Sequence, residues 1–392
     1  MVAATLAASC AGDDASVESA GSDLRPVELA ADAGPSAGFQ GRADIDPTGN
    51  RVSRGAGDLD GPAIEVVLDS PAIWLVPSAP TPAAPWAAVL ADGHLVWIEP
   101  ATGEVVVLDE AWGDAEPIVH AGDRVDRWDL LEDFPAALPD GRSVTGSGSN
   151  VSGSSVTVVL ADPTDRYRHG VLGDVVEAGA IEIYAADGGA APAARVELVD
   201  EVVEGRSALL GDADGDGVDE ILVTQSESER GARLVLYDLA GERLAESTAV
   251  GRGNRWRSQI AIAPVGPDGE IEIIDVRTPH LGRTIEWFRL DGDALVRVAE
   301  LDGFTNHVLG SRNLDLGIVA DADGDGRLEV VVPTADRRAL GVVGRTGSGA
   351  ELEFTVELSG RLSSNVGAVD HPDGGVTYAA ATDDGVVRFW VS

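Results

Sequence analysis

Short runs of apolar and β-branched residues recur along the chain, and most alternate with polar residues and end at Gly, Asp or Pro. Such runs predict β-strands separated by tight turns. The runs at 94–98 and 104–108 flank a Pro-Ala-Thr-Gly turn and predict a hairpin. No long helical periodicity occurs in the sequence, and only 129–133 fits a short helical turn. Other clear strand signals lie at 232–237, 284–288 and 339–343.

A turn frame is repeated between these runs. It reads Asp-x-Asp-x-Asp-Gly-x-x-Glu and is followed directly by an apolar run. The two complete copies span 212–220 and 321–329. Their acidic residues at frame positions 1, 3, 5 and 9 are Asp212, Asp214, Asp216 and Glu220 in the first copy, and Asp321, Asp323, Asp325 and Glu329 in the second.

Three degenerate copies keep part of the frame. The copy at 174–182 keeps positions 1, 6 and 9, the copy at 268–272 keeps positions 5, 6 and 9, and the copy at 373–375 keeps little beyond the turn. The frame glycines 179, 217, 269, 326 and 375 are about 49 residues apart on average, a period typical of a four-stranded β-propeller blade. We therefore predict an all-β fold, a β-propeller of four-stranded antiparallel blades over 61–392. Seven blades are favoured, with six or eight as alternatives, and residues 64–68 are expected to pair with the final strand at 386–390.

The frame also predicts a metal site. Three carboxylates on one side of a tight turn suit a hard cation that takes about six to eight oxygen ligands, and Gly at position 6 allows the positive φ that the turn needs. Position 12 is Val223 or Val332, so an EF-hand, which needs Glu there, is excluded.

The arrangement resembles the calcium loops of FG-GAP / VCBS repeats, as in the integrin α-chain N-terminal propeller. The resemblance covers roughly 160–392 and implies two Ca²⁺ sites. It implies ligation by the side chains at frame positions 1, 3, 5 and 9 and by the backbone carbonyl at position 7, which is Val218 in one copy and Arg327 in the other. Solvated acidic turns are the alternative, and they are favoured for the degenerate copies.

Cationic and amide side chains lie at similar positions before successive frames. In three repeats an arginine stands 14 residues before the frame glycine. Such side chains could converge on one mouth of a propeller channel and bind an anion, because guanidinium groups recognise carboxylate and phosphate. Pairing with acids of neighbouring blades is the alternative. The predicted ligand cluster consists of Arg168, His169, Arg255, Trp256, His307, Arg312, Asn313 and Arg361.

The N-terminus resembles a bacterial lipobox. Small apolar residues precede Cys10, which is the only cysteine in the sequence. We expect residues 1–10 to be a lipoprotein-type signal segment with Cys10 as the lipidation site, and residues 11–60 to be a disordered acidic tether. We therefore expect an exported protein at the cell surface or in the periplasm, held to a membrane only through this lipid.

The amino-acid composition excludes one class of binding partner. The formal net charge is −39, and the sequence contains no lysine, so nucleic acid is excluded as a partner. We expect a monomeric binding or scaffold module for an unknown protein, glycan or small anion, rather than an enzyme. The alternative is a propeller-type lyase or hydrolase acting on acidic polysaccharide, with His169, His280 or His307 as the base.

Overall fold

The computed structural model describes residues 48–119, 124–127, 136–139, 141–147, 155–185 and 191–392, all within the compact unit Phe39–Ser392. Every regular element in these ranges is a β-strand, which confirms the all-β prediction. The described residues include no helix long and apolar enough to cross a membrane.

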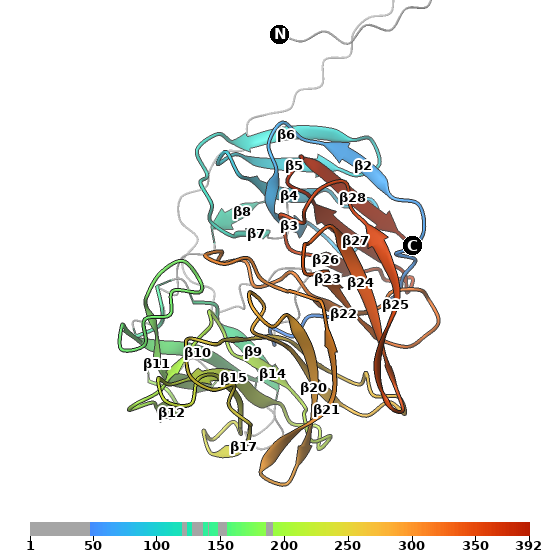
Figure 1. The fold of residues 1–392 in the computed structure, drawn as a ribbon. Coiled ribbons are helices and arrows are strands. Elements are labelled where there is room, and N and C mark those ends of the chain that lie inside the picture. The colour runs from blue at the N-terminus through green and yellow to red at the C-terminus, as the bar shows by residue number, and fades with distance from the viewer. Residues whose placement is uncertain (1–47, 120–123, 128–135, 140, 148–154, 186–190) are drawn as a thin grey trace, which may run out of the picture. The chain divides into compact units, whose positions relative to one another are not determined.

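Most strands fall into four-stranded antiparallel units that follow one another along the chain (Figure 1). The unit closest to the N-terminus contains β3 (Ala72–Pro77), β4 (Trp86–Leu90), β5 (Leu95–Glu99) and β6 (Glu104–Asp109). The short pair β7 (Pro117–Val119) and β8 (Val125–Arg127) follows it. The next two units are β9 (Val144–Ser147), β10 (Ser155–Thr164), β11 (Glu177–Ala185) and β12 (Ala194–Glu197), and then β14 (Leu209–Gly211), β15 (Glu220–Ser226), β16 (Arg233–Tyr237) and β17 (Arg243–Ser247).

The remaining units complete the series. One contains β18 (Arg257–Ala263), β19 (Glu272–Arg277), β20 (Thr284–Asp291) and β21 (Ala294–Asp302), and the next contains β22 (Ile318–Asp321), β23 (Glu329–Pro333), β24 (Ala339–Thr346) and β25 (Gly349–Glu357). The last combines β26 (Gly367–Asp370), β27 (Val376–Ala381) and β28 (Val386–Val391) with β2 (Ile64–Val67). Strand β2 pairs with β28 in the register Ile64↔Phe389, which confirms the predicted pairing of the two ends.

Successive units pack face to face. Leu222 of β15 and Ile273 of β19 belong to one apolar cluster, and Trp86 of β4 and Phe389 of β28 belong to another. Central strands are therefore covered on both faces, and each residue of β15 is buried, whereas the outer strand β25 has no buried residue. This burial explains the continuous apolar runs of the central strands, because a strand covered on both faces has no polar face.

Two further contacts join neighbouring units. Strand β13 (Val202–Val203) pairs with both β11 and β15, and β17 pairs in parallel with β21 through Glu246↔Ala294. The units from β9 to β21 thus share one continuous hydrogen-bonded sheet. The stacked four-stranded units agree with the predicted propeller blades, but the blade count is not settled because 128–135, 140 and 148–154, between β8 and β10, lie outside the described residues.

Residues 48–59, here called the crossing segment, run across four units. The side chain of Asn50 accepts a hydrogen bond from Ile262 N (2.8 Å) and donates one to Leu210 O (3.3 Å). Strand β1 (Val52–Ala56) then pairs in parallel with β22, and Arg54 N donates to Asp370 Oδ2 of β26 (2.8 Å).

The crossing segment alters the predicted boundary of the tether. The sequence placed residues up to 60 in a disordered tether, whereas Val52–Ala56 form β1. Hydrogen bonds from polar side chains and the backbone hold this strand in place. Such bonds require no apolar periodicity, so the sequence carries no strand signal here. Residues 11–47 of that range, together with Cys10 and 129–133, lie outside the described residues.

Candidate functional site

The two complete frames form matching loops between the first and second strands of their units. Loop 212–220 joins β14 to β15, and loop 321–329 joins β22 to β23. In each loop the first aspartate accepts two backbone hydrogen bonds: Asp212 from Gly215 N (2.6 Å) and Gly217 N (3.0 Å), and Asp321 from Gly324 N (2.7 Å) and Gly326 N (3.1 Å). All four glycines have positive φ, between 77° and 88°, which a residue with a Cβ adopts only at a cost.

The loops gather carboxylates. Ligand oxygens of Asp212, Asp214 and Glu220 lie within 4.8 Å of one another, as do those of Asp321, Asp323 and Asp325. At the fifth frame position, Asp325 belongs to the second group, whereas Asp216 is not part of the first; Asp216 Oδ1 accepts from Val218 N and Asp325 Oδ1 accepts from Arg327 N, both at 2.8 Å. Two acidic groups that could hold metal ions are thus present among the described residues.

The position-9 glutamates fit a cation. Glu220 Oε2 accepts a hydrogen bond from Ala213 N (2.8 Å), and Glu329 Oε2 accepts one from Ala322 N (3.0 Å). The other oxygen of Glu329, Oε1, is buried and has no hydrogen-bond partner among the described residues. Burial, with the neighbouring carboxylates, raises the pKa of Glu220 to about 7 and that of Glu329 to about 8. A divalent cation would satisfy the unpaired oxygen and relieve the repulsion.

The degenerate copies differ at that ninth position. Glu182 accepts from Tyr184 Oη (2.6 Å) and pairs with Arg195, and Glu272 accepts from Arg289 Nε (2.9 Å) and Arg345 Nε (2.7 Å). Arginine thus neutralises in these copies the carboxylate that would face a metal. Glu182 and Glu272 are buried and lie in β11 and β19, so at this position the copies are not the solvated turns that the sequence favoured.

Part of the predicted ligand cluster lies together. His169 Nδ1 lies 2.6 Å from Oε1 of the buried Glu204, and the indole Nε1 of Trp256 donates to the backbone oxygen of Glu204 (3.2 Å). The Trp256 ring packs edge-on against His307 (centroids 4.9 Å apart) and stacks on His280 (6.3 Å). Histidines from two loops therefore surround one tryptophan.

Hydrogen bonding sets the tautomers of this group. His307 Nε2 donates to the carbonyl oxygen of Ser311 (2.8 Å), so in the neutral ring Nδ1 is the acceptor. His280 Nε2, 2.9 Å from that Nδ1, is then the donor, and His280 Nδ1 carries a lone pair. Burial lowers the pKa of His280 to about 4 and that of His307 to about 3, so both rings are neutral at pH 7.

The other predicted ligand residues already have partners and are more dispersed. Arg168 pairs with Asp165, Arg312 with Asp174 (3.1 Å) and Arg361 with Asp383 (3.9 Å). Asn313 is buried and donates to Ile73 O (2.9 Å). Only Arg255 makes no side-chain hydrogen bond or ion pair among the described residues.

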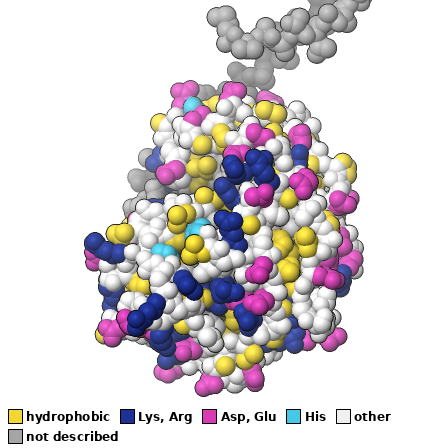
Figure 2. All heavy atoms as spheres, in the orientation of Figure 1, with side chains coloured by type: hydrophobic (Ala, Val, Ile, Leu, Met, Phe, Trp, Pro, Cys, Tyr) yellow, Lys and Arg dark blue, Asp and Glu magenta, His cyan; other side chains and the backbone are white. Residues whose placement is uncertain are grey.

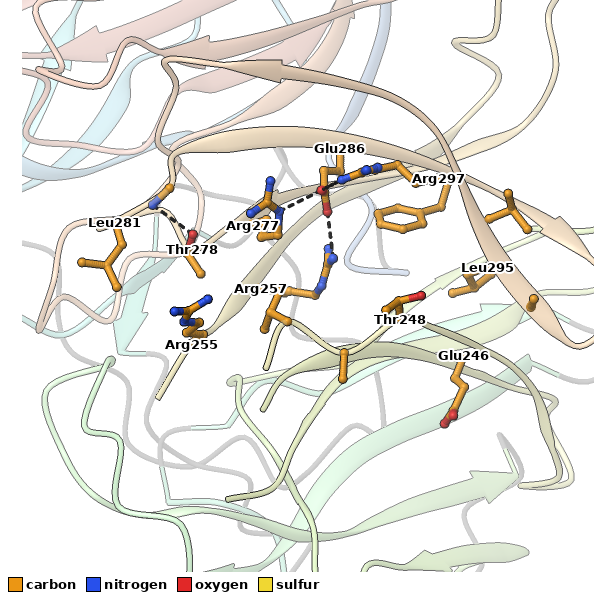
Figure 3. Close-up of a pocket in the computed structure, with 16 residues that line it drawn as sticks. Glu246, Thr248, Arg255, Arg257, Arg277, Thr278, Leu281, Glu286, Leu295 and Arg297 are labelled. Atoms are coloured by element: carbon orange, nitrogen blue, oxygen red, sulfur yellow. Dashed lines mark hydrogen bonds and ion pairs between the residues drawn. The ribbon is translucent and has the colours of Figure 1, made fainter. Parts of the chain in front are cut away.

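Arg255 stands at a pocket of about 690 Å³ between β17 and the unit β18–β21 (Figure 3). The floor and walls also carry three arginines that converge on Glu286. Arg257 Nη2 donates to Glu286 Oε2 (2.7 Å), and Arg277 Nε and Arg297 Nη1 donate to Glu286 Oε1 (2.8 and 2.6 Å). Figure 2 shows arginine side chains gathered along the middle of this face, beside two histidine patches.

Sequence reasoning found Arg255 but missed Arg277, Arg297 and Glu286. These residues lie within strands, where an isolated charge in an apolar run was the only signal. Arg257 and Arg277 are cross-strand partners in β18 and β19, so they come together only once the register is known.

Comparisons with known proteins give distant likenesses only. No family model matches the chain, and no curated protein matches it. Among solved structures, the crystal structure of BBS1N in complex with ARL6DN, soaked with mercury, is similar at 10% identity over 83% of this chain and 92% of that one (TM-score 0.47). The Myceliophteria thermophila Cps50 (Swd1) beta-propeller domain is similar at 13% identity over 84% of this chain and 100% of that one (TM-score 0.37). Likenesses this distant carry no argument about what the chain binds.

Proposed function

We propose that the protein is an exported, seven-bladed β-propeller of the FG-GAP / VCBS type that binds an anionic ligand and is stabilised by two calcium ions. The observation that carries the binding function is Arg255, an exposed guanidinium without a partner among the described residues, at the mouth of a large pocket. In a chain of net charge −39, a local group of arginines focuses an anion onto this one place.

Calcium has a structural role in this proposal. Asp212, Asp214, Asp216 and Glu220 would hold one ion with the Val218 carbonyl; Asp321, Asp323, Asp325 and Glu329 would hold the other with the Arg327 carbonyl. The ion supplies the positive charge that lets four carboxylates stand close together. Both loops lead into buried central strands, so occupied loops would fix the ends of those strands.

Cys10 would attach the chain to a membrane surface through a lipid, as expected from the sequence alone. The ligand-binding unit would then act outside the cytoplasm as a monomer. Calcium at the concentrations found outside cells suits sites of modest affinity, roughly 10⁻⁴–10⁻³ M.

Calorimetry with galacturonate and with neutral galactose tests the binding function. Galacturonate is expected to bind and galactose is not, because only the former offers a carboxylate to Arg255. Arg255→Ala should weaken galacturonate binding by about tenfold, the loss of one charge-assisted contact. Arg361→Ala is the matched control, since Arg361 is also exposed but does not line the pocket. Equal binding of both sugars, or equal loss in both variants, would contradict the proposal.

A second candidate is an enzyme acting on acidic polysaccharide, and the His169–Glu204 pair favours it. The buried Glu204 carboxylate accepts a hydrogen bond from Nδ1–H of His169. Nε2 of the neutral ring then carries the lone pair and can accept a proton. Incubation with polygalacturonate and alginate, followed by ultraviolet absorbance of unsaturated products, tests this candidate. Activity that is retained in His169→Gln would remove His169 from the role of base.

A further inference from the structure

The pocket at Arg255 has two chemically different ends. Arg255 and Thr278 lie together at one end, whereas Leu295 and Glu246 lie at the other (Figure 3). Between them, Arg257, which is buried, is engaged by Asp275 and Glu286. Of the four arginines that line the pocket, Arg255 alone has no partner among the described residues, and it therefore marks a single end of the pocket.

Apolar side chains cover much of the remaining lining. Phe288 and Leu295 are buried in the floor, while Leu281 and Val296 keep 73% and 42% of their surface exposed at the rim. Exposed apolar side chains beside a pocket lose contact with water when an apolar ligand covers them, and that loss favours binding. A ligand that is charged throughout would leave these side chains in contact with polar groups.

Charge also sets the orientation of a ligand. Glu246 at the far end pairs with Arg233 and Arg243, both at 2.9 Å, so these guanidinium groups are already engaged and offer no free charge to a second anion there. An anion is favoured only at the Arg255 end. The pocket thus suits a molecule with one anionic group and an apolar body.

Residues with a strained backbone lie at the end of the pocket that carries Thr278. Thr278 has φ of 48° although it is β-branched, and Arg283 and Asn254, on either side of the wall, have φ of 58° and 51°. Thr278 N donates to Trp256 O (2.8 Å), and its Oγ1 accepts from Gly282 N (3.0 Å), so the loop that carries Leu281 is held in shape. Strained residues of this kind concentrate at binding sites, where the shape is set before the ligand arrives.

We infer that the pocket binds a small amphipathic anion, with its carboxylate at Arg255 and its aromatic or aliphatic body over Phe288, Leu295 and Val296. This inference rests on the proposed anion-binding function and names its ligand class. A volume of about 690 Å³ accommodates such a molecule whole.

Three probes test the inference by calorimetry: 4-phenylbutyrate, the neutral 4-phenylbutanol, and galacturonate. We expect 4-phenylbutyrate to bind at least about tenfold more tightly than either of the others, because it alone uses both ends of the pocket. Arg255→Ala should weaken phenylbutyrate binding and leave phenylbutanol unchanged.

Val296→Ser should weaken phenylbutyrate by roughly fivefold and leave galacturonate unchanged. Val298→Ser is the matched control, since Val298 is 36% exposed but does not line the pocket. Circular dichroism and melting curves would establish that each variant is folded.

The outcomes separate the two proposals. Galacturonate binding as tightly as phenylbutyrate overturns the amphipathic ligand class but leaves anion binding standing. Phenylbutanol binding as tightly as phenylbutyrate, with no galacturonate binding, overturns both. Binding of phenylbutyrate that Val296→Ser and Val298→Ser reduce equally places the apolar body elsewhere and also overturns the inference.

Discussion

Loops 212–220 and 321–329 have the same frame and the same internal hydrogen bonds but different surroundings. Asp321 is buried, and its backbone oxygen accepts from Gly57 N (2.9 Å) and from Tyr378 Oη (3.1 Å). Asp212 is only partly buried. Loop 321–329 is thus tied into the crossing segment and the next unit.

Charge differs as well. Position 7 is Val218 in the first loop and Arg327 in the second, where Arg327 pairs with Asp325 (2.8 Å) and Glu353 (3.5 Å). In the second loop, Arg327 therefore neutralises part of the carboxylate charge. The first loop has no such arginine and depends more on an added cation. One frame can serve as a metal-dependent turn or as a turn that also holds neighbouring parts of the chain together.

Calcium removal is expected to give the largest effect. At a calcium concentration 100-fold above Kd, each site contributes about 2.7 kcal/mol to the free energy of unfolding, so chelation should cost roughly 5 kcal/mol. Asp214→Ala and Asp323→Ala each disable one loop at an equivalent exposed position. We expect the variant that retains loop 212–220 to gain more from calcium, as measured by urea unfolding with and without chelator. Equal stability with calcium and with chelator would remove both metal sites.

The next effect compares the first aspartates in chelator, where no bound ion contributes. Asp321→Ala removes two backbone hydrogen bonds at a buried position and is expected to cost about 3 kcal/mol, while Asp212→Ala at the more exposed position costs about half as much. Urea unfolding gives both values. Similar losses would mean that the burial of Asp321 adds nothing to the cost of losing these hydrogen bonds.

The pH dependence of the calcium-free protein should distinguish the glutamates. Because folding raises the pKa of Glu220 to about 7 and of Glu329 to about 8 from 4.5, the folded chain binds more protons than the unfolded chain in that window. Stability is therefore highest below about pH 4.5 for these groups and is lost as pH rises, by roughly 2 kcal/mol.

Substitution identifies each contribution in chelator. Glu329→Gln should flatten the melting temperature between pH 7 and 8, and Glu220→Gln should roughly halve its slope between pH 5 and 7, where Glu329 still contributes. Added calcium should abolish the slope in the parent protein. A melting temperature that rises with pH in chelator would contradict this assignment.

The smallest effect concerns Arg327. Arg327→Val makes the second loop resemble the first and removes an exposed ion pair worth about 0.5 kcal/mol. The variant should be slightly less stable in chelator yet bind calcium a few-fold more tightly, because the cation no longer competes with a guanidinium. Calcium titration by calorimetry, with Arg338→Val as an exposed control, measures the change.

The sequence predicted the features that depend mainly on contacts between residues close together in the chain. The frame at 212–220 folds through contacts within nine residues, and the pairing of 64–68 with the last strand follows from closure of the propeller, which brings the two ends together. The crossing segment was missed because Asn50 and Arg51 are held by backbone atoms of strands 160 or more residues away. The pocket was missed for a similar reason, since its floor needs the parallel pairing of β17 with β21.

The crossing segment also determines how the molecule would carry mechanical load. Tension applied to the chain ahead of residue 48 reaches β14, β18, β22 and β26 through separate hydrogen bonds. A pull along β1 loads its bonds to β22 in shear, so several must rupture together before any single blade unravels.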